Sequence, residues 1–217
     1  MTQDVLLQES RDRIAACRER ISRLDEDSLD LLFREARTHN AWQGREVSDD
    51  QLHEIWDVMK FGATSANTLP ARIVFIRSPQ AKAKLGACLS PGNVDKTMKA
   101  PVTALLAHDT RFFEGFERLF PIYPAMADQW ADDPDGARSF ARHQGTLQGA
   151  YLILAIRAVG LDAGPMLGFD RKMVDAAFLA GTAWESNFLC NIGYGALEGI
   201  LGPRFYRYGF DEACRIA

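Results

Sequence analysis

Hydrophobic residues recur along this chain in two patterns, one with helical spacing and one as short unbroken apolar runs. Over residues 4–24, Ile14, Cys17, Ile21 and Leu24 recur at spacings of three and four, opposite a densely charged face. This pattern predicts an amphipathic helix. Its apolar stripe is too narrow to support an isolated helix in water, so we expect it to pack against the rest of the chain or a partner chain.

The same spacing predicts several further helices. One begins near Leu29 and ends near Asn40, and another follows Ser48, which can form a capping box with Gln51. Others are expected near 79–88, over 110–119, over 138–159 and after Asp170, which can cap a short helix.

Three apolar runs predict buried strands. They span 71–77, 101–107 and 187–193, and polar or proline residues bound the first two. Segment 121–137 is rich in proline, aspartate and aromatic residues, which is typical of an excursion over a site, and the chain after Gly193 is irregular. With no internal repeat or linker, the pattern favours one compact α+β domain.

Composition narrows the function classes. The chain has 217 residues and a net charge of −4, and no Lys/Arg-rich run offers a track for nucleic-acid phosphates. The longest apolar stretch is too short to span a bilayer, and the N-terminus shows no signal pattern. Four scattered cysteines indicate neither a disulfide framework nor a zinc site. We therefore expect a cytoplasmic protein without a nucleic-acid or membrane partner and without a metal.

The loop from Gly62 to Arg72 holds small hydroxyl and amide side chains just before a predicted strand. Ser65 and Asn67 could donate to a flat polar ligand there, although a solvated helix-to-strand connection uses the same residue types. The sequence has no zinc-ligand spacing, nucleophile elbow or phosphate loop. The Gly193-Tyr194-Gly195 segment resembles a dinucleotide-binding motif, but too few residues follow it to form the helix, strand and acidic residue of such a unit. Site-like loops without a nucleophile or metal set indicate that a cofactor performs the chemistry.

Four segments together resemble the FMN-dependent nitroreductase superfamily, more narrowly the branch that includes the malonic semialdehyde reductase of pyrimidine degradation. They are Ala36–Trp42, Thr64–Ile76, Leu161–Asp170 and Asn191–Gly195. The resemblance covers 28–217 and leaves 1–27 as an N-terminal helical extension. It implies a three-layer α+β fold with a central mixed, mostly antiparallel sheet flanked by helices, and an intertwined homodimer that binds FMN at the subunit interface.

The resemblance also implies a set of cofactor-binding residues. Arg37, Arg204 and Arg207 match phosphate contacts, with Thr38 beside them. Asn40 matches a position near the flavin pyrimidine edge that often carries lysine or arginine, so a positive charge is missing there.

Other segments match the contacts to the flavin ring. Thr64, Ser65 and Asn67 match a loop along the ring, with Ser65 reaching across the dimer. Asn93 and Lys96 match a loop at the N1/O2 edge, although Lys96 could equally be a solvated surface lysine. The backbone of Pro165, Met166 and Gly168 matches the segment beside N5 and O4.

The implied function is that of an FMN-dependent oxidoreductase using NADH or NADPH, with ping-pong hydride transfer through flavin N5. The oxidant would be a small aldehyde acid, malonic semialdehyde giving 3-hydroxypropanoate, or a nitroaromatic or quinone. No side chain need act as a catalytic nucleophile, and the proton could come from water or His143, which could instead be a capping or surface histidine. The alternatives are a flavin-binding sensor or carrier without turnover, and an oxygen-using flavin-fragmenting or dehalogenating relative.

Overall fold

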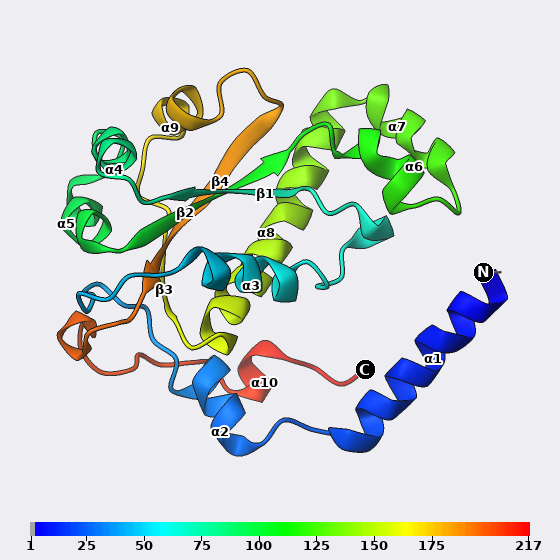
Figure 1. Ribbon diagram of the computed structural model, residues 1–217, viewed down its shortest axis with the longest axis horizontal. Coiled ribbons are helices and arrows are strands. Elements are labelled where there is room, and N and C mark those ends of the chain that lie inside the picture. Colours follow the sequence, from blue (N-terminus) through cyan, green and yellow to red (C-terminus); the bar gives the residue numbers. More distant parts are fainter. Residues whose placement is uncertain (1–2) are drawn as a thin grey trace. The chain divides into compact units, whose positions relative to one another are not determined.

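Four antiparallel strands form the centre of the fold in the order β1-β2-β4-β3 (Figure 1). The computed structural model describes residues 3–217. Strands β2 and β4 lie in the middle of the sheet, and β1 and β3 are its edges. The strands are β1 (Ala71–Ile76), β2 (Val102–Asp109), β3 (Asp162–Met166) and β4 (Trp184–Gly193).

The chain forms two compact units, Met1–Ala36 and Arg37–Ala217. In the first unit α1 (Gln3–Arg20) is followed by α2 (Glu26–Leu29) and a π-helical turn (Asp30–Arg34). The Arg34 guanidinium joins the last two elements, because it lies 2.7 Å from a Glu26 carboxylate oxygen and 2.5 Å from one of Asp30. The first helix ends four residues earlier than the predicted end at Leu24, and the second is shorter than predicted and irregular.

Helices cover both faces of the sheet in the second unit (Figure 1). Long α8 and α3 pack on one face, and α4, α5 and α9 pack on the other. Their bounds are α3 (Asp49–Met59), α4 (Pro79–Gly86), α5 (Pro91–Lys99), α8 (Pro134–Ala158) and α9 (Arg171–Phe178). The predicted α+β fold, with helices flanking a central and mostly antiparallel sheet, is confirmed. The expected mixed character is not seen, because every strand pair in the described residues is antiparallel.

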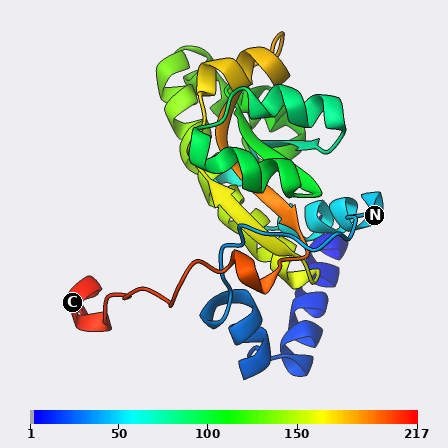
Figure 2. The same ribbon diagram turned by 90° about the vertical axis from the view of Figure 1, so that its left-hand side faces the viewer.

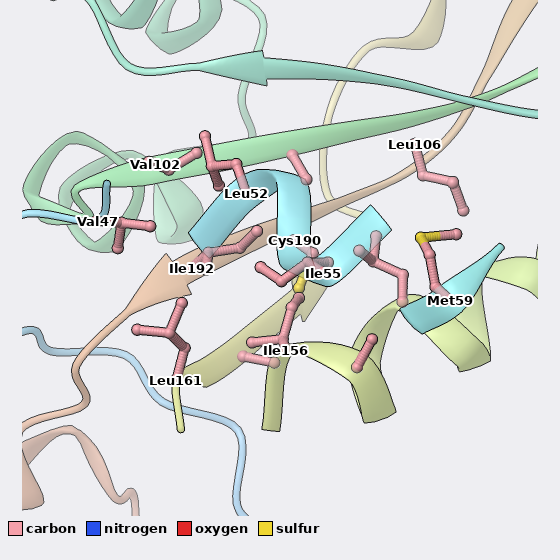
Figure 3. Packing of buried hydrophobic residues seen from close by; sticks show 14 of the residues in the cluster. Val47, Leu52, Ile55, Met59, Val102, Leu106, Ile156, Leu161, Cys190 and Ile192 are labelled. Carbon is pink, nitrogen blue, oxygen red and sulfur yellow. The ribbon is translucent and has the colours of Figure 1, made fainter. Parts of the chain in front are cut away.

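Alternation along β2 divides the core between these two faces. Val102, Ala104 and Leu106 point to α3 and α8, whereas Leu105 and Ala107 point to α4 and α9. This is the two-residue period of a strand buried on both sides. Figure 3 shows the first cluster, in which side chains of α3 and α8 meet those of β2 and β4.

The predicted excursion between β2 and α8 forms an aromatic cluster of its own. A 3₁₀ turn (Phe112–Gly115) leads into α6 (Phe116–Leu119), and a second turn (Pro124–Ala127) leads into α7 (Asp128–Ala131). Phe112 and Phe116 are buried there, and Trp130 packs on Phe140 of α8 with 4.5 Å between ring centroids. The aromatic residues therefore hold this segment against the start of α8.

Three elements differ from the sequence-based expectation. Residues 162–166 form β3, which its glycine and proline concealed; as an edge strand it tolerates proline. Residues 91–99 form helix α5 instead of a loop, because Pro91 occupies the first turn, where its missing N–H costs nothing. Helix α8 begins at Pro134 instead of near 138, since the Asp133 side chain accepts from the Gly136 N–H.

The chain after β4 is irregular, as predicted. It contains a 3₁₀ turn (Leu197–Gly199) and the short α10 (Phe210–Ala213). Figure 2 shows this tail leading away from the sheet. Its large apolar side chains are exposed, namely Leu197, Leu201, Phe205, Tyr206, Tyr208, Phe210 and Ile216. Among the described residues, no helix is both long and apolar enough to cross a membrane.

Candidate functional site

Helix α5 presents two of the predicted site residues, Asn93 and Lys96, on one face. They are three residues apart, so their side chains lie one above the other on the helix. The Asn93 side-chain amide donates to the carbonyl oxygen of Gly168 at 2.8 Å. The Ser90 N–H donates to the same oxygen at 3.0 Å. The start of α5 is thus held directly against the segment that follows β3.

Lys96 is held by another predicted site residue. Its Nζ donates to Oδ1 of Asn40 at 3.1 Å, and Asn40 in turn donates through Nδ2 to the Gly199 carbonyl at 3.2 Å. The indole N–H of Trp42 donates to the Lys96 carbonyl at 3.0 Å. Lys96 therefore places a positive charge beside the uncharged Asn40, and its side chain is half-buried instead of fully solvated.

The segment from Pro165 to Gly168 leaves the edge of the sheet beside α5. Met166 is buried, and Gly168 lies where a side chain would not fit, since an added Cβ would come within 2.4 Å of the Asn93 amide nitrogen. The glycine allows the backbone to approach α5 closely. Asn40, Asn93, Lys96 and the Pro165–Gly168 backbone therefore form one cluster, which we call the α5 cluster.

His39 directly precedes Asn40 of this cluster in the chain. It is buried, and its Nδ1 lies 3.4 Å from a carboxylate oxygen of Asp162. The other oxygen of Asp162 accepts from the Gly195 N–H at 2.8 Å. An added Cβ at Gly195 would fall 2.1 Å from the imidazole ring. The last glycine of the Asn191–Gly195 segment is thus required by the close approach of His39.

The loop carrying Thr64, Ser65 and Asn67 is fixed from a different side. The Ser65 N–H donates to the Gln144 side chain of α8 at 2.9 Å, and the Asn67 amide donates to the Leu119 carbonyl of α6 at 2.8 Å. Thr64 Oγ1 accepts from the Leu69 N–H at 3.2 Å. Ala66, Asn67 and Leu69 all have positive φ, so this is a strained, well-determined turn. Its contacts lead to α6 and α8 instead of α5.

The three predicted phosphate-binding arginines lie on or near the tail. Arg37 donates to the Gly202 carbonyl at 2.8 Å, while Arg207 donates to the backbone carbonyls of Phe205 and Tyr206, both at 3.0 Å. Burial lowers the pKa of the Arg157 guanidinium in α8, and the nearby charge of Arg204 adds to this shift. Thr38 is exposed. Arg37 and Arg157 therefore lie near residues 202–204 of the tail, and Arg207 lies further along it.

Sequence reasoning missed the residues that hold the site in place. Trp42 fixes α5, and Gln144 fixes the loop. Gln148, one turn after Gln144, accepts from the N–H of Ala71 at the start of β1 at 2.8 Å. Two glutamines four residues apart on the apolar face of a predicted helix were the available signal. His143 lies on the exposed face of α8.

Comparison with known proteins identifies the family. No protein-family model matches the chain. A protein of Ralstonia pickettii provisionally named NADH dehydrogenase/NAD(P)H nitroreductase HadB is 52% identical over 193 residues, covering 88% of this chain and 97% of that protein. A relative with the same provisional name from Stenotrophomonas maltophilia is 55% identical over 195 residues, covering 89% and 98%.

Solved structures show the same fold at low sequence identity. A provisional nitroreductase from Exiguobacterium sibiricum, solved in complex with FMN, superposes with a TM-score of 0.78 at 16% identity, covering 90% of this chain and 99% of that one. The fold is thus that of the nitroreductases. This chain belongs to the NADH dehydrogenase/NAD(P)H nitroreductase family of oxidoreductases. The predicted family and enzyme class are confirmed.

Proposed function

We propose that this protein uses FMN to transfer hydride from NADH or NADPH to a small carbonyl or nitro compound. The observation that carries the proposal is the hydrogen bond between Lys96 and Asn40 beside the Pro165–Gly168 backbone. The relatives are named for NAD(P)H, and the E. sibiricum neighbour was solved with FMN. When bound, FMN supplies the hydride transfer, and the residues of the α5 cluster bind and orient it.

The residues of the α5 cluster fit a flavin. A fixed ammonium group suits the pyrimidine edge of the ring, which becomes negative on reduction, and Asn40 orients that group before the cofactor arrives. The absence of a side chain at Gly168 lets the backbone after β3 pack directly against α5, which sets its position beside Lys96. The guanidinium groups of Arg37, Arg204 and Arg207 suit a terminal phosphate, which the fork of an arginine binds with two parallel bonds.

Two separated halves of the candidate site support a homodimer. The α5 cluster and the Thr64–Asn67 loop are anchored to different elements, so a second chain could complete each site. The tail exposes Phe205, Tyr206 and Tyr208, which an isolated chain leaves in water. We expect a stable dimer with an interface above roughly 2,000 Å². A flavin-loaded monomer in sedimentation experiments would contradict this.

The electron acceptor is the finer part of the proposal. The resemblance to the malonic semialdehyde reductase branch favours a short aldehyde acid reduced to 3-hydroxypropanoate, and the names of the relatives favour nitro compounds. The proton for the product could come from water or from His143, which lies on the exposed face of α8. Quinones are the third class of acceptor to be tested.

An anaerobic spectroscopic experiment tests the function. The FMN-loaded protein is mixed with NADH or NADPH, and the flavin absorbance near 450 nm should bleach quickly and return when an acceptor is added. A bound flavin that neither nucleotide reduces would support a sensor or carrier. Reoxidation by oxygen alone, with loss of the flavin or of a halide from a substrate, would support the fragmenting or dehalogenating alternative. A panel of malonic semialdehyde, nitroaromatics and quinones under single-turnover conditions then ranks the acceptors.

A further inference from the structure

A buried lysine lies directly behind the α5 cluster. Lys82, on α4, is only 4% exposed. Its Nζ donates to the Thr97 carbonyl of α5 at 2.9 Å and to the Thr103 hydroxyl of β2 at 2.7 Å. Burial lowers the pKa of Lys82 to about 8. Among residues 3–217 no carboxylate forms an ion pair with Lys82, and an unpaired buried cation is costly, so its retention calls for a physical reason.

The hydrogen bonds that begin at Lys82 run in one direction through the core. Thr103 accepts from Lys82 and donates to Oδ1 of Asn191 at 2.7 Å, and Asn191 donates through Nδ2 to the Thr97 hydroxyl at 3.2 Å. The last hydrogen bond of the series runs from the Thr97 hydroxyl to the sulfur of Met166 at 3.5 Å. Thr97, Thr103 and Asn191 are fully buried.

Each threonine hydroxyl in this series of hydrogen bonds accepts one bond and donates the next. Because the Lys82 ammonium can only donate, it sets the direction in which every following hydroxyl points. Hydrogen bonds linked in this way polarise one another, and a fully satisfied series fixes a single arrangement of the core. Asn191, the first residue of one of the four family-like segments, thus has a role inside the core instead of on a ligand.

The chain of bonds ends at the two segments that make the α5 cluster. Thr97 directly follows Lys96 on α5, and Met166 lies between Pro165 and Gly168 at the end of β3. We propose that Lys82 is a positioning residue of the flavin site, which holds α5 and the end of β3 in register through Thr103, Asn191 and Thr97. This inference rests on the proposed function only in naming FMN as the ligand.

Two measurements on the full-length protein test the proposal. Hydrogen exchange of the FMN-free protein reports the order of segments 91–99 and 162–168, and fluorescence titration reports the FMN dissociation constant. In Lys82→Met both segments should exchange faster while 71–76 is unchanged, and FMN binding should weaken at least tenfold. The matched control is Lys84→Met, an exposed lysine of the same helix, which should leave both readouts within twofold of the wild type.

Thr103 provides a second pair of variants should Lys82→Met fail to fold. Thr103→Val removes the hydroxyl at nearly constant shape and should reproduce the faster exchange and the weaker FMN binding. Thr103→Ser keeps the hydroxyl and should show wild-type exchange and wild-type FMN affinity. Wild-type exchange and affinity in Lys82→Met, an equal rise of exchange in every segment, or identical behaviour of the Val and Ser variants would each overturn the proposal. If the wild-type protein binds no FMN, the proposed function fails, and the exchange measurement still decides the role of Lys82.

Discussion

The ammonium Nζ of Lys96 lies 3.1 Å from Oδ1 of Asn40. This hydrogen bond joins helix α5 to the first residues of the second unit, which begins at Arg37. Asparagine at position 40 carries no charge of its own. By accepting from Lys96 it fixes a cation that a flexible surface lysine would not hold in place. The two residues therefore act as one cationic group.

Replacing Lys96 should impair reduction of the flavin. Lys96→Gln removes the fixed charge that we propose stabilises the negative reduced ring, so the midpoint potential of bound FMN should fall and its reduction by NAD(P)H should slow about tenfold or more. Rapid-mixing absorbance measures the rate. Lys99→Gln, an exposed lysine one turn later on α5, is the control. Equal rates in the two variants would show that Lys96 is not at the flavin.

Replacing Gly168 should separate α5 from the end of β3. In Gly168→Ala the new Cβ would lie 2.4 Å from the Asn93 amide nitrogen, which must move and lose its bond to the Gly168 carbonyl. The expected loss is about 1 kcal/mol of stability, together with weaker FMN binding. Gly92→Ala on α5 meets no atom within 4 Å and should be neutral or stabilising in the same denaturation and titration experiments. Equal FMN affinity in both variants would contradict the close packing at Gly168.

Arg207 should contribute to phosphate binding without supporting the fold. Arg207→Ala is expected to weaken FMN binding by about 1.5–3 kcal/mol, the loss of a charge-assisted hydrogen bond. The thermal midpoint of the FMN-free protein should not change, because the side chain is exposed and its hydrogen bonds within residues 3–217 go to its own tail backbone. Arg215→Ala, further along the tail, is the matched control. An unchanged FMN affinity in Arg207→Ala would reject the assignment.

Stability should depend on pH through Lys82. Its pKa is lowered from 10.5 to about 8 in the folded protein. Below pH 8 the folded state carries the full cost of the buried charge. Between pH 8 and 10.5 the folded state binds fewer protons than the unfolded state, so stability rises with pH there and levels off above this window.

The size of this effect is on the order of 3 kcal/mol. Denaturant unfolding at several pH values measures it, and the contribution of Lys82 is the difference between the wild type and Lys82→Met, since other groups titrate in both. Parallel pH profiles of the two proteins would show that Lys82 is not a desolvated cation.

Removing residues 1–25 should reduce stability without affecting the flavin. These residues lie within the first compact unit and include α1, and none of them resembles a flavin ligand. The truncated protein should show a lower thermal midpoint or weaker dimerisation, with the flavin spectrum and the hydride-transfer rate nearly intact. A dimeric truncated protein that loses FMN, or reacts much more slowly with NAD(P)H, would place this segment in the site.

Local sequence signals were sufficient for much of the fold. Ser48 and Gln51 form the predicted capping box of α3, and Asp170 caps α9 by accepting from the Met173 N–H. The apolar runs of β1, β2 and β4 form strands as expected, since each satisfies a rule that involves only near neighbours. Strands β2 and β4 are largely buried, whereas in the edge strand β1 only Ala71 and Ile76 are buried and the residues between them are half-buried. The edge strand β3 was missed because its glycine and proline are acceptable only where a sheet ends, and that depends on strand order.

By itself, the sequence determined most of the helices apart from α5, the central strands and the family, because capping, periodicity and motif order are encoded in residues close along the chain. Only the tertiary structure decided that Lys96 reaches Asn40, that Asn93 binds the Gly168 carbonyl, and that Lys82 lies behind both. These contacts join residues that are far apart in sequence but adjacent in space. Which side chains meet is set by how α4 and α5 pack on the sheet, and that packing leaves no periodic signal in the sequence.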